Sequence, residues 1–279
     1  TTGVTNTLIG ALSGDSITTG GNNVALGYAS LSGDILGADN VAIGFGAMSS
    51  TDNARANVAM GFNTLTQMDY GSLTYSHNIA IGFEAGKLTT TATRNTIIGG
   101  LAGDAITTGG NNVALGYSSL GSQTIANTNV AIGDSAMATN VAADRNVAVG
   151  HEALFSMTAA TTADHYNVAV GYNAGRAMTS GYDNTLIGGK AGDALTVGVA
   201  NTALGKDALT TSVDGNFNTA LGYKALEDYE DGAGNGHNTA VGAQSQLNAS
   251  TGEFNTSLGS LSMGAGVVTA DHCVAIGYK

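Results

Sequence analysis

Three segments of the chain bring tyrosine, aspartate and histidine side chains together. They read TQMDYGSLTYSH (66–77), FSMTAATTADHY (155–166) and EDYEDGAGNGH (227–237). Tyrosine rings can stack on sugar rings, and neighbouring Asp and His side chains can make hydrogen bonds. We therefore predict a weak receptor-binding surface formed by Asp69, Tyr70, Tyr75, His77, Asp164, His165, Tyr166, Asp228, Tyr229, Asp231 and His237. The alternative is that sequence duplication has copied one tolerated bulge.

The same segments fit no standard catalytic or metal site. Paired carboxylates act as acid and base only where their surroundings separate their pKa values, and nothing in a Gly-rich acidic stretch suggests this. No GxSxG-type context is present for a nucleophilic serine. Asp228, Glu230 and Asp231 offer oxygen ligands for Ca²⁺, but their spacing matches no standard calcium loop. We predict a protein that is not an enzyme and has no catalytic residues, metal site or cofactor.

Charge and composition exclude several partners. The 279 residues include 9 Lys and Arg against 21 Asp and Glu, for a net charge of −12. This balance argues against nucleic acid and anionic membranes, and it fits neutral or basic partners better than acidic ones. No apolar run approaches the ~20 residues that span a bilayer, so we expect no membrane insertion by this segment. Cys273 is the single cysteine, which excludes an internal disulfide. The chain begins with Thr1, so we expect a mature product or a fragment.

A short repeat must position these segments. The motif Asn, β-branched, Ala, aliphatic, Gly recurs along the chain, most often every 17 residues, and Leu8, Ile97, Leu186 and Ser257 are the exceptions at the Ala position. It starts at Asn6, Asn23, Asn40, Asn57, Asn78, Asn95, Asn112, Asn129, Asn146, Asn167, Asn184, Asn201, Asn218, Asn238 and Asn255, and a sixteenth copy starts at Cys273. Starts at 6, 95, 184 and 273 define three 89-residue blocks, 6–94, 95–183 and 184–272, plus a final partial coil. A fixed short period is typical of a solenoid.

The motif has the composition of a strand. The second position is Val, Ile or Thr and the fourth is aliphatic in every copy. Positions two and four share one face, and the small third residue and Gly share the other. Because both faces are apolar, we expect one to line the coil and the other to meet another copy of the chain; the pattern does not decide which is inside. Asn and Gly suit the corners, and stacked Asn side chains can hydrogen-bond along the coil.

A step of 17 residues leaves no room for a strand, a helix and two turns. We therefore predict one all-β solenoid domain over 1–279, with about 16 coils, two short strands per coil and no long helix. At ~4.8 Å per coil its length is roughly 77 Å.

The motifs NVAIG, NTALG and NVAVG, each followed by a small residue, resemble the left-handed parallel β-roll of trimeric autotransporter adhesin heads. The stretch NTALGYKAL (218–226) resembles repeats of bacteriophage tail fibres. The resemblance covers 6–279 and implies a left-handed, homotrimeric coil that attaches to a cell-surface glycan or protein receptor. The repeat step of this chain is longer than the usual step of the adhesin repeats. The stalk, anchor and chaperone domains of such proteins are not recognisable within 6–279.

These observations predict a structural and attachment module of an extracellular trimeric fibre, on a virion or on a bacterial surface. A bacteriophage tail fibre is the first interpretation and a bacterial surface adhesin the alternative. A polysaccharide-cleaving spike and an ice-binding solenoid rank lower. The column of Thr185, Thr202, Thr219, Thr239 and Thr256 suits ice, but it is mostly Val in the first two blocks. We expect the three long segments to lie along one edge, five coils apart.

Overall fold

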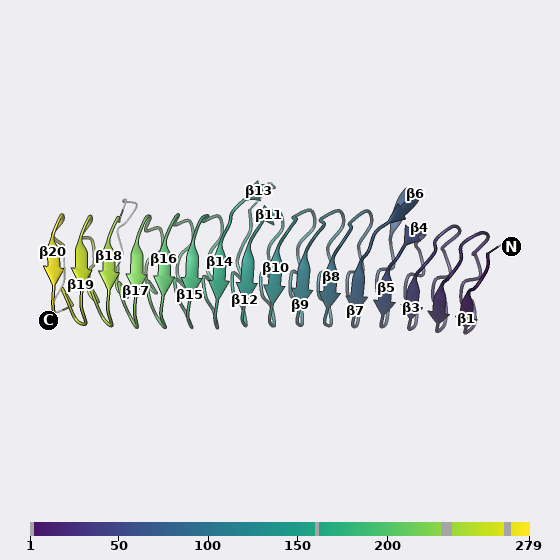
Figure 1. Ribbon diagram of the computed structural model, residues 1–279, viewed down its shortest axis with the longest axis horizontal. Coiled ribbons are helices and arrows are strands. Elements are labelled where there is room, and N and C mark those ends of the chain that lie inside the picture. The colour runs from purple at the N-terminus through teal and green to yellow at the C-terminus, as the bar shows by residue number, and fades with distance from the viewer. Residues whose placement is uncertain (1–2, 160–161, 230–235, 265–268) are drawn as a thin grey trace. The chain divides into compact units, whose positions relative to one another are not determined.

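The protein is a parallel β-solenoid in a computed structural model that describes residues 3–159, 162–229, 236–264 and 269–279 (Figure 1). Within these ranges there is no helix, which confirms the all-β prediction. The chain divides into two compact units, Thr1–Ala142 and Ala143–Lys279.

The first unit stacks its main strands in one parallel ladder. They are β1 (Thr7–Ile9), β2 (Val24–Leu26), β3 (Val41–Ile43), β5 (Val58–Met60), β7 (Ile79–Ile81), β8 (Thr96–Ile98), β9 (Val113–Leu115) and β10 (Val130–Ile132). The register keeps equivalent motif positions together, so that Ala25 pairs with Ala42 and Ala42 with Ala59. Two further strands, β4 (Asp52–Arg55) and β6 (Asp69–Tyr75), pair with each other outside this ladder.

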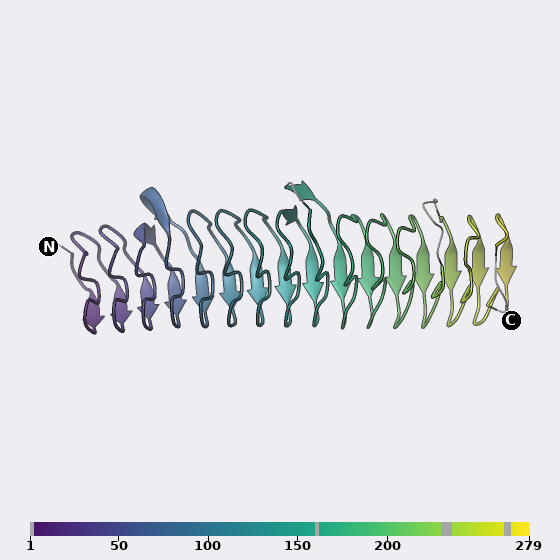
Figure 2. The ribbon, with the colours of Figure 1, turned by 180° about the vertical axis from the view of Figure 1, so that it is seen from behind.

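The second unit repeats the arrangement, as the view from behind shows (Figure 2). Its ladder contains β12 (Val147–Val149), β14 (Val168–Val170), β15 (Thr185–Ile187), β16 (Thr202–Leu204), β17 (Thr219–Leu221), β18 (Thr239–Val241), β19 (Thr256–Leu258) and β20 (Val274–Ile276). A short pair outside the ladder joins β11 (Ala143–Asp144) to β13 (Ala163–Asp164).

Most coils contain one strand, so the prediction of two strands per coil is wrong. The rest of the coil consists of turns in which residues other than Gly adopt left-handed backbone angles; Asn22, Ala29 and Leu31 have φ of 60°, 51° and 53°. The amides of these turns bond in both directions along the stack. Ala29 N donates to the carbonyl of Ala11 in the coil before, and Leu31 N donates to the carbonyl of Ala47 in the coil after, each at 2.9 Å. Turn hydrogen bonds thus replace the second strand.

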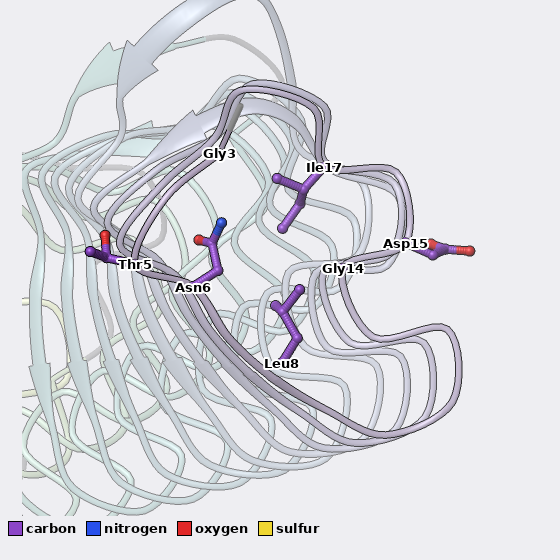
Figure 3. A pocket seen from close by; sticks show the side chains of 7 residues that line it. All are labelled: Gly3, Thr5, Asn6, Leu8, Gly14, Asp15 and Ile17. Atoms are coloured by element: carbon purple, nitrogen blue, oxygen red, sulfur yellow. The ribbon is translucent and has the colours of Figure 1, made fainter. Parts of the chain in front are cut away.

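The small face of the strand points into the coil. Ala25, Ala42 and Ala59 are fully buried, whereas the flanking Val24 and Leu26 are 39% and 43% exposed. The aliphatic face of the motif is therefore the outer one, which decides the question that the sequence left open. Viewed end-on, the first coil shows Asn6 and Leu8 pointing inward (Figure 3).

Side-chain sizes inside the coil compensate for one another. In most coils a third-position Ala accompanies a buried Leu or Met six residues later, as Ala203 accompanies Leu209. Where the third position is Leu186, the residue six positions later is Gly192, and a Cβ added there would lie 2.9 Å from Leu186 Cδ2. Ile97 and Gly103 repeat the exchange. Leu8 and Gly14 do the same, so the three large residues in the Ala column are each matched by a Gly in one close-packed interior.

The motif Gly is required by coil-to-coil contact. At Gly44, φ is +128°, and an added Cβ would lie 2.3 Å from the carbonyl oxygen of Gly61 in the next coil. A side chain here would clash with backbone that cannot move away. Gly therefore lies at a corner, as predicted.

The motif Asn residues form a buried ladder. Asn201 N donates to Asn184 Oδ1 at 3.0 Å, and Asn184 Nδ2 donates to the carbonyl of Gly198 at 2.8 Å. Both side chains are fully buried. The ladder was predicted, but the left-handed corner is the residue before each Asn, such as Ala200 with φ of 54°. Cys273 continues the ladder through its backbone, since its N donates to Asn255 Oδ1 at 2.8 Å.

Candidate attachment surface

The first long coil inserts its extra residues as a bulge in a strand. Asp52 pairs with Asp69, but Ala54 pairs with Thr74, so the register shifts between these two pairs. The strand pair β4–β6 projects beyond the turns of the neighbouring coils (Figure 1). A bulge re-aims the side chains that follow it, and here it brings Tyr75 opposite Arg55.

Three exposed or half-exposed side chains meet at the end of this bulge. The Arg55 guanidinium carbon lies 5.6 Å from the centre of the Tyr75 ring, and Nη1 donates to the Tyr75 hydroxyl at a long 3.4 Å. The Tyr75 and His77 rings stack with centres 5.9 Å apart. Tyr75 is 57% exposed. We call this group, which consists of Arg55, Tyr75 and His77, the Arg55 cluster.

The second long coil builds a related group, the Arg145 cluster. The Arg145 guanidinium lies over the Tyr166 ring, 5.7 Å from its centre, and Nη1 donates to the Tyr166 hydroxyl at 3.2 Å. Asp164 pairs with Arg145, and its Oδ2 also accepts a hydrogen bond from Tyr166 at 3.0 Å. The negative charge of Asp164 raises the pKa of the Arg145 guanidinium. Tyr166 is 51% exposed.

Three predicted contact residues have buried or half-buried side chains. Tyr229 is fully buried and is the largest fully buried side chain of the described core. His165 is only 6% exposed, and its Nδ1 lies 2.7 Å from the carbonyl of Ala163. Tyr70 is half-buried, and its hydroxyl donates to the carbonyl of Ala92 at 2.5 Å. Burial raises the pKa of the Tyr70 hydroxyl. None of these three side chains is exposed.

The other predicted residues lie at the surface where they are described. Asp69, Tyr75, His77, Asp164, Tyr166, Asp228 and His237 are exposed. Asp231, and Glu230 of the weighed Ca²⁺ site, lie outside the described residues. The exposed residues form two separate clusters, with Asp69, Asp228 and His237 outside both.

The five-coil spacing predicted for the long segments is wrong for the third. Coils begin at Asn146, Asn167, Asn184, Asn201 and Asn218, so the coil holding 227–237 is four steps after the coil holding 155–166. His237 instead joins an aromatic stack with Phe217 and Phe254, at centre distances of 4.8 and 5.0 Å. Phe254 stacks in turn on His272 at 5.0 Å.

A second aromatic stack escaped the sequence reasoning. Tyr28, Phe45, Phe62 and Phe83 follow the motif Gly in successive coils and stack at 5.1–5.3 Å between ring centres. Their recurrence directly after Gly was the available signal. Because the ring faces contact one another, the stack presents mainly ring edges to solvent. It therefore extends the apolar outer face and offers little area for a stacked sugar.

One carboxylate lies inside the coil. Asp34 is fully buried, and its Oδ1 accepts a hydrogen bond from Gly37 N at 2.7 Å. Burial raises the pKa of Asp34 to about 6, nearby Asp52 adds to the shift, and Arg55 opposes it. At the equivalent place in the next block, Gln123 Nε2 donates to the carbonyl of Ala126 at 2.6 Å. Asp34 thus serves the interior hydrogen bonding of the coil.

Other site types gain no support. Among the described residues, no three His, Cys, Asp or Glu side chains are grouped so that they could hold a metal ion. The described part of the chain contains no helix long and apolar enough to cross a membrane. The hollow lined by Gly3, Thr5, Asn6, Leu8, Gly14, Asp15 and Ile17 is the open end of the first coil (Figure 3). It is bounded by the same columns that form the core elsewhere.

Comparison with protein-family models and with curated proteins gives no match to this chain.

Proposed function

We propose that this chain is a structural and attachment module of an extracellular fibre made of three parallel, left-handed copies. A bacteriophage tail fibre is our first assignment, and a bacterial surface trimeric adhesin is the alternative. Both assignments are supported by the motif resemblance and by the parallel solenoid in which the motif recurs. The fibre would lie on the virion or the bacterial surface and contact a glycan or protein receptor.

The outward aliphatic face carries the trimer proposal. In the first unit Leu26 is 43% and Leu115 is 42% exposed, and in the second unit Leu204 is 47% and Leu258 is 48% exposed. Such residues recur at the same two motif positions in coil after coil. Contiguous apolar surfaces beyond a few hundred Å² mark interaction sites on soluble proteins.

The period of this face supports a second copy of the chain as its partner. Its side chains repeat once per coil, at roughly the 4.8 Å strand spacing. A partner with another period would lose register within a few coils, whereas a second copy of the chain keeps it throughout. Closed rotational symmetry then buries the same face on every copy.

The trimer is tested by sedimentation equilibrium at micromolar concentration. We expect the mass of three chains for the wild type and a smaller species for Leu204→Lys with Leu221→Lys. Val213→Lys is the matched control, because Val213 is 46% exposed but lies outside the strand face. A folded wild-type monomer would contradict the proposal.

Attachment is tested by shortening the three long coils to the 17-residue step. The motif positions are untouched, so the coil should still fold, and binding to host cells should fall. Because a trimer repeats each surface three times, many weak contacts add by avidity. Unchanged attachment would show that these coils are only bulges. Capsid and baseplate genes beside this gene would favour the phage assignment, and a downstream membrane anchor the adhesin.

A further inference from the structure

An Arg–Tyr pair forms at each of the first two long coils, within β4–β6 at the first and directly after β11 and β13 at the second. In both, a guanidinium lies over a tyrosine ring, at 5.6 and 5.7 Å, and Nη1 donates to that tyrosine's hydroxyl. The Arg145 cluster contains a carboxylate, Asp164, that bonds to both partners. The Arg55 cluster has none.

The Arg145 cluster shows how an Arg–Tyr pair holds a carboxylate. Asp164 Oδ2 takes one hydrogen bond from the guanidinium and one from the tyrosine hydroxyl. Charge-assisted bonds of this kind are stronger than neutral ones, and the planar guanidinium matches a carboxylate in shape. The protein's own side chain therefore fills this position.

In the Arg55 cluster the corresponding position is unfilled by any described residue. Arg55 forms no ion pair in the described part of the chain. Its Nη1 bond to the Tyr75 hydroxyl is 3.4 Å long, and its Nε is buried without a partner among the described residues. Tyr75 and His77 present exposed, stacked rings beside it.

We propose that the Arg55–Tyr75 pair binds a carboxylate from outside the chain, carried by an acidic saccharide. The guanidinium and the Tyr75 hydroxyl would donate to the carboxylate as Arg145 and Tyr166 donate to Asp164. The stack here ends at exposed His77, whose ring stacks on no described ring other than Tyr75, so its second face can contact a sugar ring, which favours a saccharide over an acidic peptide. The inference deepens the attachment function proposed above and rests on it for its biological setting.

The surrounding charge restricts the ligand. Asp52 lies on the same strand as Arg55, Asp69 pairs with Asp52 across the strand pair, and Asp34 interacts with Arg55 from inside the coil. The chain as a whole carries −12. This field repels polyanions, so the site selects a single carboxylate on an otherwise neutral saccharide.

The test is calorimetric titration of the full chain with a trisaccharide that contains one uronic acid. We expect one site per chain, and at least about tenfold weaker binding of the carboxyl-reduced trisaccharide. Arg55→Gln should weaken binding at least about tenfold, and Tyr75→Phe about three- to tenfold. Equal binding of the acidic and reduced sugars would overturn the proposal, as would full binding by Arg55→Gln.

The Arg145 cluster supplies matched variants. Arg145→Gln should leave the titration unchanged, because Asp164 already occupies that pair. Asp164→Ala should vacate it and raise the stoichiometry from one site to two. Failure to gain a site would contradict the shared geometry, and this holds even where Arg55→Gln does not fold.

A peptide with one Glu binding as tightly as the trisaccharide would overturn the saccharide assignment. Because these titrations need no cells, they can fail independently of host attachment.

Discussion

The two faces of each strand differ in whether the single chain completes them. Inside the coil, a large residue at one position is met by Gly at another, as Leu186 is by Gly192. Outside, large aliphatic residues recur with no such exchange, and Leu204 stays 47% exposed. Side-chain size is therefore adjusted on the inner face, where the packing partner belongs to the same chain. The outer face is suited to a surface that repeats with it.

The largest effect is expected from breaking the interior ladder. Asn184→Ala removes the acceptor for Asn201 N and the donor to the carbonyl of Gly198. Each buried group left unpaired costs about 1–3 kcal/mol, so we expect a loss of about 2–6 kcal/mol in unfolding free energy. Denaturant unfolding measures it. Asn248→Ala, which removes one half-buried 3.2 Å bond to Gly264, should cost less than about 1.5 kcal/mol. Equal losses would show that the ladder is not special.

Size compensation gives the next effect. Leu186→Ala should lower the unfolding free energy by about 2–5 kcal/mol, because it leaves a cavity beside Gly175 and Gly192. Adding Gly192→Leu recreates the arrangement of Ala203 and Leu209 in the next coil, where Leu209 adopts φ of 55°. The double variant should therefore be more stable than Leu186→Ala. If the changes in unfolding free energy caused by Leu186→Ala and Gly192→Leu simply add in the double variant, the two side chains do not fill the same space.

The buried carboxylate should produce a pH-dependent effect of similar or smaller size. The pKa of Asp34 is about 6 in the fold against 3.8 ordinarily, so the folded chain binds the proton more tightly. Stability from this group is therefore present below pH 4 and is lost as the pH rises towards 6, by up to about 3 kcal/mol. Asp34→Gln places at this position the neutral residue that the next block has at the equivalent Gln123.

Unfolding free energies at pH 4 and pH 7 check this prediction. At pH 7, Asp34→Gln should have a higher unfolding free energy than the wild type. Between pH 4 and pH 7, its unfolding free energy should fall less than that of the wild type. Asp104 and Asp193 also have pKa values raised by burial, and they are unchanged in both proteins. The difference between the two curves therefore isolates Asp34. If the unfolding free energy of Asp34→Gln falls as much as that of the wild type, groups other than Asp34 cause the pH dependence.

The smallest effect on a single chain is expected from the outer face. Leu204→Ser, on an exposed side chain, should change the unfolding free energy of a lone chain by no more than about 0.5 kcal/mol. The melting temperature of the wild type should nevertheless rise with protein concentration if copies associate through this face. The melting temperature of Leu204→Ser should depend much less on protein concentration. A large loss at the lowest concentration would mean that Leu204 packs within its own chain.

The sequence predicted the coil because a strict period leaves few alternatives. The strand position, the Gly corner and the Asn ladder all followed from conserved spacing between repeats. The inner face could not be decided, because an Ala face and an aliphatic face are both apolar. Two strands per coil were predicted wrongly, since left-handed turns outside Gly and Asn have little sequence signature.

The contact residues were harder to predict for a different reason. Extra length shows that a coil bulges but not which side chains the bulge turns outward. For Tyr229 a signal existed: it follows Asn218 by the same number of residues as Met68 follows Asn57, and both are fully buried. Arg55 and Arg145 had no common position relative to the motif, since each precedes its Asn by a different distance. Arg55 lies opposite Tyr75 in the β4–β6 pairing, whereas Arg145 and Tyr166 each lie directly before a motif Asn in successive coils.

The Asn ladder also determines how the chain can reach this structure. Its hydrogen bonds join residues 17, 20 or 21 positions apart, as in Asn201 with Asn184, Asn238 with Asn218 and Asn78 with Asn57. Each new coil closes a loop of this modest length, which keeps contact order low and favours rapid folding. Growth can begin at any coil and spread by addition to either neighbour. A region opened by heat or force can then close again on the template of the intact coil beside it, without unfolding the rest.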